Sequence, residues 1–466
     1  MFVTNWISTT KIQKISEITN FFRHYFLSRT EVKYDEYKES GFGWIGEVPS
    51  LWSNLRLRFV CEFRNGYTPS KANPEFWKDG SIPWYRMEDI RETGRKLKEA
   101  KQYITKEAVK GGGLFEAGSF ILATTATIGE HAVLIVDSLA NQQFTNLRIR
   151  KSLEATLLRD YFYYYLFVID DYCKATTKTS TFPAVSMELL KNCHVVFPSP
   201  EQQQNIVDYL DKKCGEIDKV ISAQQKRIAL LQELKQSAIT HAVTKGLNPN
   251  VEMKDSGVEW IGKVPRHWEI VHLKRVLKEK MQYGANEPAE SDDTSYPRYI
   301  RITDITANGE LRPETFKSLE DEKAKDYLLE KGDVLFARSG ATVGKTFLFN
   351  SDIKACYAGY LIKASCNRKQ MKPKFLYYYT QSSAYECWKS SVFIQSTIQN
   401  IGAEKYQMMY IPIPTLKEQE VIITYAREKS KMFDSSISKA QHQVALLQEY
   451  KQSLITEVVT GKRKVC

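Results

Sequence analysis

A stretch near the start of the chain returns almost unchanged in its second half. The first copy reads Lys38-Glu39-Ser40-Gly41-Phe42-Gly43-Trp44-Ile45-Gly46-Glu47-Val48-Pro49-Ser50-Leu51-Trp52. The second copy, 216 residues later, reads Lys254-Asp255-Ser256-Gly257-Val258-Glu259-Trp260-Ile261-Gly262-Lys263-Val264-Pro265-Arg266-His267-Trp268. A period of this length exceeds the ~20–45 residues of a solenoid unit, so it indicates the tandem duplication of a whole domain.

A second repeated stretch has the same offset. Leu230-Leu231-Gln232-Glu233-Leu234-Lys235-Gln236-Ser237 returns as Leu446-Leu447-Gln448-Glu449-Tyr450-Lys451-Gln452-Ser453. Its composition predicts a helix, so the order along the chain is domain, helix, domain, helix. The sequence between these anchors diverges heavily, which indicates two copies of one scaffold that carry two different surfaces.

Apolar residues in the first helix step by alternating four and three positions, which is the spacing of a coiled-coil seam. The helix is predicted to begin after Pro198-Ser199-Pro200 and to stop at Gly246. Adding 216 reproduces the seam in the second helix, so we expect the two helices to pair. A solenoid or bundle core is the alternative, but a seam this narrow leaves the rest of each helix polar. The residues predicted to pair the helices are Ile217, Ile221, Ile228, Leu231, Phe433, Ile437, Val444 and Leu447.

Between the anchors the pattern is that of a mixed α/β fold. Phe120–Ala123 and Val334–Ala337 follow glycine turns and are predicted to be strands. Residues 157–168 and Pro373–Tyr379 are predicted to be aromatic helices. We therefore predict two tandem α/β domains, each followed by a long helix.

The charge balance favours an anionic partner. The chain has 466 residues, with 66 Lys and Arg against 55 Asp and Glu, which gives a formal net charge of +11. Nucleic acid is a better candidate than a membrane, because no apolar run approaches the ~18 residues that a span needs. The eight cysteines form no Cys-x-x-Cys pair. Such thinly spread cysteines are typical of reduced thiols in a cytoplasmic protein.

No motif in the chain supplies catalytic chemistry. Gly340-Ala341-Thr342-Val343-Gly344-Lys345-Thr346 is similar to a phosphate-binding loop, but three residues separate its glycines where four are needed. We expect it to be a turn between two strands. The seven histidines are scattered, and Cys193-His194 adjoin inside a predicted strand, where packing is a better interpretation than a metal ligand or a nucleophile.

Three repeated elements together resemble the specificity subunit of type I restriction-modification systems. They are the Ser-Gly-x-x-Trp-Ile-Gly-x-Val-Pro-x-x-Trp anchor, the proline-rich helix entry followed by Glu and Gln, and the Leu-Leu-Gln-Glu-x-Lys-Gln-Ser helix. The resemblance covers about residues 33–461, and both copies carry it. It implies target recognition domains at 33–200 and 247–414, and conserved spacer helices at 201–246 and 415–466 that pack as an antiparallel coiled coil. Residues 1–32 would form an N-terminal extension.

The resemblance also implies a function. In that family the two domains read two half-sites on double-stranded DNA, separated by a fixed gap, and the subunit has no activity alone. It docks two methyltransferase subunits, which use S-adenosylmethionine to methylate adenine. It also docks restriction subunits, which use ATP and magnesium to translocate and cut DNA. We therefore expect these partners for this chain, no cofactor of its own, and no membrane.

The family's DNA contacts lie in divergent loops, so we expect them in the turns beside the anchors. Arg suits guanine, Asn and Gln suit adenine, and Ser or Thr suits a phosphate or a thymine methyl group. For each residue a solvated loop or an internal ion pair is the competing interpretation. The candidates in the first domain are Tyr67, Thr68, Ser70, Lys71, Arg86, Thr124, Thr125, Lys178, Ser180 and Thr181. Those in the second are Tyr283, Asn286, Arg301, Arg338, Ser339, Ser396, Thr397, Gln399 and Asn400.

Three other functions remain open from the sequence. A free-standing DNA-binding regulator would purify without a methyltransferase, and an enzyme would turn over with magnesium or S-adenosylmethionine. A coiled-coil scaffold for proteins alone would show no salt-dependent affinity for DNA.

The two helix entries depart from a strict repeat. Pro200 leads directly into Glu201-Gln202, whereas Thr415-Leu416-Lys417 separates Pro414 from Glu418-Gln419. We interpret this as a two-residue insertion, which leaves the exact register of the second helix open.

Overall fold

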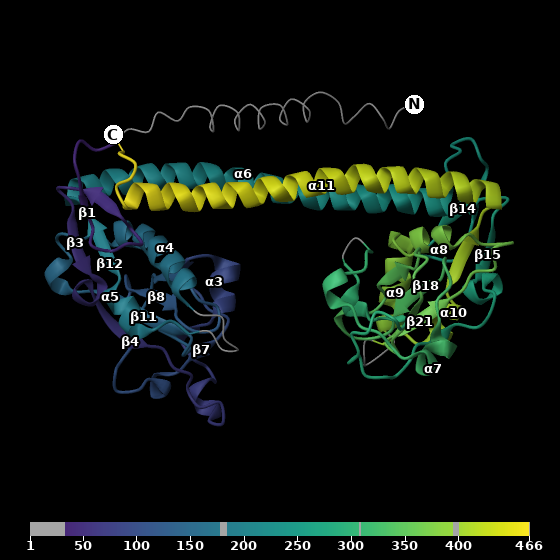
Figure 1. Ribbon diagram of the computed structural model, residues 1–466, viewed down its shortest axis with the longest axis horizontal. Coiled ribbons are helices and arrows are strands. Elements are labelled where there is room, and N and C mark those ends of the chain that lie inside the picture. Colours follow the sequence, from purple (N-terminus) through teal and green to yellow (C-terminus); the bar gives the residue numbers. More distant parts are fainter. Residues whose placement is uncertain (1–32, 178–183, 307–308, 395–399, 466) are drawn as a thin grey trace. The chain divides into compact units, whose positions relative to one another are not determined.

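The computed structural model describes residues 33–177, 184–306, 309–394 and 400–465 (Figure 1). It divides into two compact units, the first comprising the chain up to Ser222 and again from Ala445, the second running from Ala223 to Val444. The long helices α6 (Pro200–Lys245) and α11 (Leu416–Val459) therefore each contribute to both units. Each unit combines one α/β domain with a segment of both helices.

The first domain has a five-stranded core sheet of order β4-β11-β8-β9-β6, in which only β6 joins its neighbour in parallel. A second sheet has the order β10-β5-β7, and two-stranded ladders join β1 to β2 and β3 to β12. The elements are β1 Tyr37–Glu39, β2 Glu47–Pro49, β3 Ser53–Arg56, α2 Leu57–Val60, β4 Cys61–Asn65, β5 Ile82–Tyr85, α3 Met87–Thr93, β6 Lys96–Leu97, β7 Tyr103–Ile104, β8 Phe120–Ala123, β9 His131–Leu134, β10 Leu139–Ala140, β11 Phe144–Ile149, α4 Arg159–Thr176, α5 Met187–Asn192 and β12 His194–Phe197.

The second domain repeats this plan with a four-stranded sheet of order β16-β21-β18-β19. The parallel pair β17-β20 corresponds to β5-β10, and the ladders β13-β14 and β15-β22 correspond to β1-β2 and β3-β12. The elements are β13 Met253–Asp255, β14 Lys263–Pro265, β15 Glu269–His272, β16 Gln282–Tyr283, β17 Arg298–Ile300, α7 Asp321–Ala324, β18 Val334–Ala337, β19 Thr346–Leu348, β20 Ala355–Tyr357, β21 Leu361–Ala364, α8 Pro373–Tyr379, α9 Ser383–Ile394, α10 Ala403–Gln407 and β22 Tyr410–Ile413.

Several local predictions hold to the residue. β8 and β18 are the two predicted strands, α8 is the predicted helix Pro373–Tyr379, and α6 ends at Lys245, directly before Gly246. The glycine loop after β18 is a turn between two strands, as expected, because β19 follows it antiparallel. The aromatic helix predicted at 157–168 is displaced and longer, at Arg159–Thr176, and most of its residues are buried.

The helix entries share one register, so the predicted two-residue insertion is wrong. The Gln203 amide donates to the carbonyls of Thr156 and Pro198 and accepts from the Leu158 N–H. The Gln419 amide, 216 residues later, donates to the carbonyls of Gln370 and Pro414 and accepts from the Lys372 N–H. Gln203 therefore corresponds to Gln419. The prediction had matched Gln202 with Gln419, because each of these two residues directly follows a glutamate, Glu201 or Glu418.

The end of α11 completes the first unit. The Tyr161 hydroxyl of α4 lies 2.9 Å from the carbonyl oxygens of both Val196 and Val459. The Tyr37 hydroxyl of β1 donates to the Gly461 carbonyl at 3.1 Å, and Figure 1 shows β1 beside this end of α11. The first domain therefore packs on a segment that lies far from it in the sequence.

Within each unit one lysine–aspartate pair joins α6 to α11. Lys451 contacts Asp218 at 2.7 Å in the first unit, and Lys235 contacts Asp434 at 2.7 Å in the second. The offset of 216 converts Lys235 into Lys451 and Asp218 into Asp434. The duplication therefore preserves the contact and exchanges which helix supplies each charge.

The repeated tryptophans have two different environments in the first unit. Trp52 is 2% exposed, whereas Trp44 is 44% exposed. Trp52→Ala is therefore expected to lower the free energy of unfolding by ~3–5 kcal/mol, because it empties a large buried site. Trp44→Ala, the matched control, should cost under about 1 kcal/mol. Urea unfolding followed by circular dichroism measures both, and equal losses would contradict this packing.

No helix within the described part of the chain is long and apolar enough to cross a membrane.

Candidate nucleic-acid interface

In the first domain, a glycine turn and a polar turn meet at the end of the core sheet. A side chain at Gly66 would lie 2.1 Å from the Asn141 carbonyl oxygen, so only glycine fits this close approach. The approach places Thr68 beside residues 141–143, where the Thr68 hydroxyl donates to the Gln142 side-chain oxygen at 2.5 Å. Gln142 is exposed and was not predicted from the sequence.

Tyr67 is anchored rather than free. Its hydroxyl donates to the Ala108 carbonyl and accepts from the Lys110 N–H, and the Lys110 ammonium lies 4.7 Å from the ring centre. Ser70 and Lys71, which follow in the same loop, are exposed. The loop thus presents a fixed aromatic ring beside exposed polar groups suited to phosphate contacts.

The two threonines after β8 have different environments. The Thr124 side chain is buried and its hydroxyl lies 3.0 Å from that of Thr145. Thr125 is half-buried, and its backbone bridges to Ala184. Thr125 is therefore better placed than Thr124 to contact a ligand.

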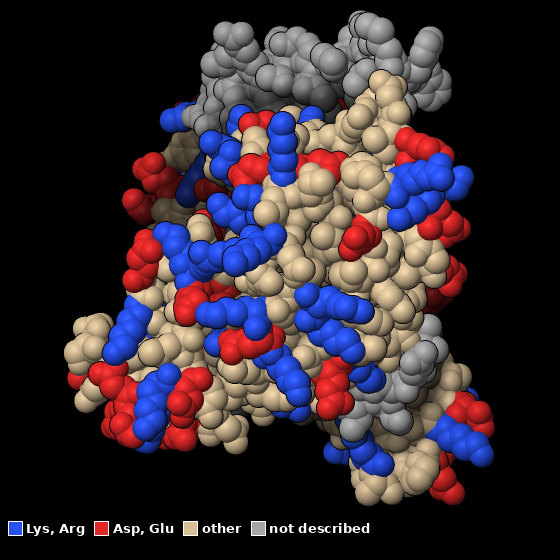
Figure 2. All heavy atoms as spheres, turned by 90° about the vertical axis from the view of Figure 1, so that its right-hand side faces the viewer, with Lys and Arg blue, Asp and Glu red and all other residues tan. Residues whose placement is uncertain are grey.

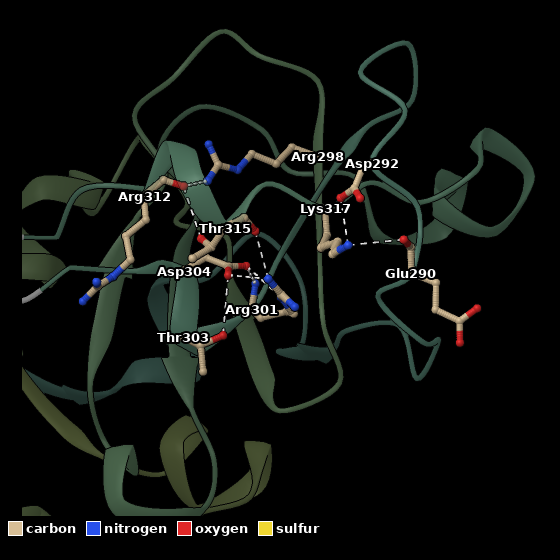
Figure 3. Close-up of polar contacts among 9 residues, drawn as sticks. All are labelled: Glu290, Asp292, Arg298, Arg301, Thr303, Asp304, Arg312, Thr315 and Lys317. Carbon is tan, nitrogen blue, oxygen red and sulfur yellow. Dashed lines mark hydrogen bonds and ion pairs between the residues drawn. The ribbon is translucent and has the colours of Figure 1, made fainter. Parts of the chain in front are cut away.

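Two predicted arginines are held inside their domains. Arg301 donates from Nε and from a terminal nitrogen to the two oxygens of Asp304, at 3.0 and 2.7 Å, and also to the Thr315 carbonyl (Figure 3). The hydrogen bonds and charge of Asp304 raise the pKa of Arg301. A base contact by Arg301 would have to compete with this ion pair.

The equivalent Arg86 begins α3 in the same way. Its backbone N–H donates to the Asp89 carboxylate at 2.7 Å, and its guanidinium contacts Glu88. In both domains, therefore, an arginine caps the start of a short helical segment, and the aspartate three residues later accepts its backbone N–H.

In the second domain, four predicted residues converge at the matching place. The Arg338 guanidinium lies 4.9 Å from the centre of the Tyr283 ring, and Ser339 pairs with Asn400 through a backbone bridge. Gly284 approaches the Tyr357 carbonyl as Gly66 approaches that of Asn141. Tyr360, which sequence reasoning missed, is 67% exposed beside this cluster, since its carbonyl accepts the Arg338 N–H.

Asn286 is exposed in the turn after Gly284, and the N–H of Gly359 donates to the neighbouring Ala285 carbonyl at 2.7 Å. It therefore lies beside the same turn as Tyr360. The other predicted contacts fall outside the described residues and stay predictions. They are Lys178, Ser180, Thr181, Ser396, Thr397 and Gln399.

The face of the second unit seen in Figure 2 carries many lysine and arginine side chains across its middle, with acidic side chains between them. Such a mixed but cation-rich surface suits weak, salt-sensitive contact with a polyanion.

The described residues hold no cluster of three or more His, Cys, Asp or Glu that could bind a metal ion. Cys193 is buried, and burial raises the pKa of its thiol. The His194 ring stacks on Phe42 and contacts Asn54 at 2.8 Å. This pair is thus packed within the domain, as the sequence indicated.

The chain thus consists of two copies of one α/β domain, whose polar residues beside the turns at Gly66 and Gly284 differ between the copies. A model of the type I restriction modification DNA specificity domain matches residues 49–230 and 265–426, one match in each repeat. The chain therefore belongs to this family of type I restriction-modification specificity subunits.

Curated specificity subunits of type I restriction enzymes are similar to this chain, some over nearly its whole length and others over one part of it. The type I restriction enzyme MjaIX specificity subunit of Methanocaldococcus jannaschii is 24% identical over 442 residues, covering 92% of this chain and 97% of that protein. The EcoprrI specificity subunit of Escherichia coli is 44% identical over 165 residues, or 34% of this chain and 41% of that protein. The fold matches a chain from a structural study of type I system assembly and conformational transition, with a TM-score of 0.62 at 18% identity, covering 88% and 98% of the two chains.

Proposed function

We propose that this chain reads a bipartite target on double-stranded DNA, one half-site with each domain, for a type I restriction-modification complex. A single observation supports this most directly. The same close approach of a glycine to a turn, at Gly66 and at Gly284, is kept in both domains, while the side chains around it differ. Two domains that read different half-sites would share the same backbone geometry and differ in the polar side chains that contact the bases.

In this proposal α6 and α11 pair as an antiparallel coiled coil that fixes the gap between the half-sites. The seam residues support the pairing, because Ile217, Ile221, Ile437 and Leu447 are buried, and Ile228, Leu231, Phe433 and Val444 are partly buried. The first unit contains the start of α6 and the end of α11, and the second contains the end of α6 and the start of α11, which supports an antiparallel arrangement. In each unit one lysine–aspartate contact, Lys451 with Asp218 or Lys235 with Asp434, joins the two helices.

The chemistry is assigned to partners. We propose that two methyltransferase subunits, with S-adenosylmethionine, and restriction subunits, with ATP and magnesium, dock on this chain. The chain itself would contribute recognition and no catalytic group. Its net charge of +11 suits the phosphate contacts that would supply much of the affinity.

Co-expression with the methyltransferase subunit, followed by methylation-aware sequencing of host DNA, tests the proposal. We expect a bipartite motif with methylated adenine that disappears when this chain is deleted. A stable complex that methylates DNA without any motif would contradict sequence reading by this chain. Purification of the chain alone with repression of transcription would favour the free-standing regulator instead.

A further inference from the structure

Arg338 differs from the other predicted arginines because no carboxylate among the described residues pairs with it. Arg86 and Arg301 contact Glu88 and Asp304. The Nε of Arg338 is buried, and the described residues offer it no hydrogen-bond partner. A buried N–H without a partner is costly unless a ligand completes it. The Nε of Arg86 is also buried without a described partner, so the lack of a carboxylate is what distinguishes Arg338.

The backbone around Arg338 is fixed on both sides. Its N–H donates to the Tyr360 carbonyl at 3.0 Å, and its carbonyl accepts from the Ile401 N–H at 2.8 Å. Arg338 thus continues β18 between two neighbouring segments. These backbone hydrogen bonds therefore fix the direction in which the Arg338 side chain projects.

The side chain is held by an aromatic ring that is itself anchored. The guanidinium carbon lies 4.9 Å from the centre of the Tyr283 ring. The Tyr283 hydroxyl accepts the Ala403 N–H at 3.0 Å, which fixes the ring at its far end. A guanidinium group stacked on a fixed ring keeps its planar set of donors in one orientation, so less entropy is lost when it binds a planar acceptor.

A planar pair of acceptors is what a guanine presents in the major groove, through O6 and N7. We propose that Arg338, positioned by Tyr283, reads a guanine in the half-site of the second domain. This inference rests on the proposed function, since it names the base that one domain recognises there. Asn400, whose side-chain oxygen is also buried without a described partner, lines the same place.

The first domain has no equivalent of this arginine. Thr124 takes the place of Arg338, because its N–H donates to the Gln143 carbonyl and its carbonyl accepts from the Val185 N–H. Its hydroxyl already contacts Thr145. The exposed amide beside it belongs to Gln142, so the first domain reads its half-site with different chemistry at this position.

The test uses the full chain in complex with its methyltransferase subunits, and DNA duplexes that carry the motif found by sequencing. Each guanine of the motif is replaced in turn by 7-deazaguanine, which lacks the N7 acceptor. In the unaltered complex, one guanine of the second domain's half-site should lose about tenfold in affinity on this replacement. This arm needs no variant, so it does not depend on the folding of a mutant.

Arg338→Ala should lower affinity for the normal duplex by about tenfold to a hundredfold and show no further loss with 7-deazaguanine. Arg338→Lys should keep the charge and lose most of the preference for guanine, because an ammonium group cannot pair with O6 and N7 as a fork. Tyr283→Leu should reduce the preference for guanine, whereas Tyr283→Phe should retain most of it. Arg266→Ala, an exposed arginine on the repeated anchor, is the matched control and should change neither property.

The outcomes separate the inference from the function on which it rests. A half-site with no N7-dependent guanine, or a 7-deazaguanine effect that persists in Arg338→Ala, would overturn the assignment of Arg338. Equal weakening on all sequences, with a salt slope reduced by about one, would make Arg338 a phosphate contact and overturn it as well. An unaltered complex without any bipartite motif would instead refute the proposed function.

Discussion

Exchange of residues 60–195 for the matching segment of another family member is expected to replace one half of the recognised motif and leave the other half unchanged. The segment lies within one compact unit with its own core sheet. Its ends are close together, because the Leu57 N–H just before it donates to the Cys193 carbonyl at 2.7 Å. The grafted domain can therefore be joined without moving the β3-β12 ladder far.

Methylation-aware sequencing of cells that express the exchanged chain measures both half-sites at once. The new half-site should be the one that the donor protein reads, and the old half-site should persist with the same adenine methylated. As a control, the chain's own segment is excised and rejoined with the same junction residues. A change in both half-sites would mean that the domains do not read DNA independently.

Insertion of one heptad into each long helix is expected to lengthen the gap between the half-sites without changing their sequences. Seven residues add ~10 Å to a helix at 1.5 Å per residue. This length corresponds to about three base pairs at 3.4 Å each. Insertions after Gln224 and after Ala440, which the offset of 216 relates, would keep the seam in phase in both helices.

The gap is read from the same sequencing experiment. A control inserts seven residues into the loop at 290–295, outside the helices, and should leave the gap as it was. An unchanged gap after the double helix insertion would refute the pairing of α6 and α11 as a ruler. Loss of all methylation, with a folded protein, would show that the methyltransferase subunits tolerate only one helix length.

The sequence predicted those features of the fold that repeat along the chain. Gly246 ended α6, and the glycine turns located β8 and β18, because these signals act over a few residues. It did not predict the closing of the first unit by Tyr161 and Val459, since a contact between residues so far apart leaves no local pattern. The prediction for the second helix entry was wrong because it matched Glu201 with Glu418. These two residues are 217 positions apart, one more than the offset of the repeat.

The candidate site was predicted less well than the fold, for a physical reason. Arg86 and Arg301 were chosen for their charge, yet each is followed three residues later by an aspartate, Asp89 or Asp304, that accepts its backbone N–H. The Arg301 guanidinium also pairs with Asp304, whereas that of Arg86 contacts Glu88. The spacing of three residues between arginine and aspartate, found in both domains, could have predicted a capped helical turn. Gln142 and Tyr360 carried no such sign, because their place beside Gly66 and Arg338 arises only when distant strands pair.

The dependence of the first domain on the end of α11 has a consequence for synthesis on the ribosome. The domain is complete only when residues 445–459 are available, although its own strands emerge long before. At ~5–20 residues per second, translation of the intervening stretch from 223 to 444 takes about ten to fifty seconds. During that interval the surface around Trp52 and Tyr161 is uncovered and open to chaperones and proteases. A nonsense mutation late in the reading frame would therefore also remove part of the packing of the N-terminal domain.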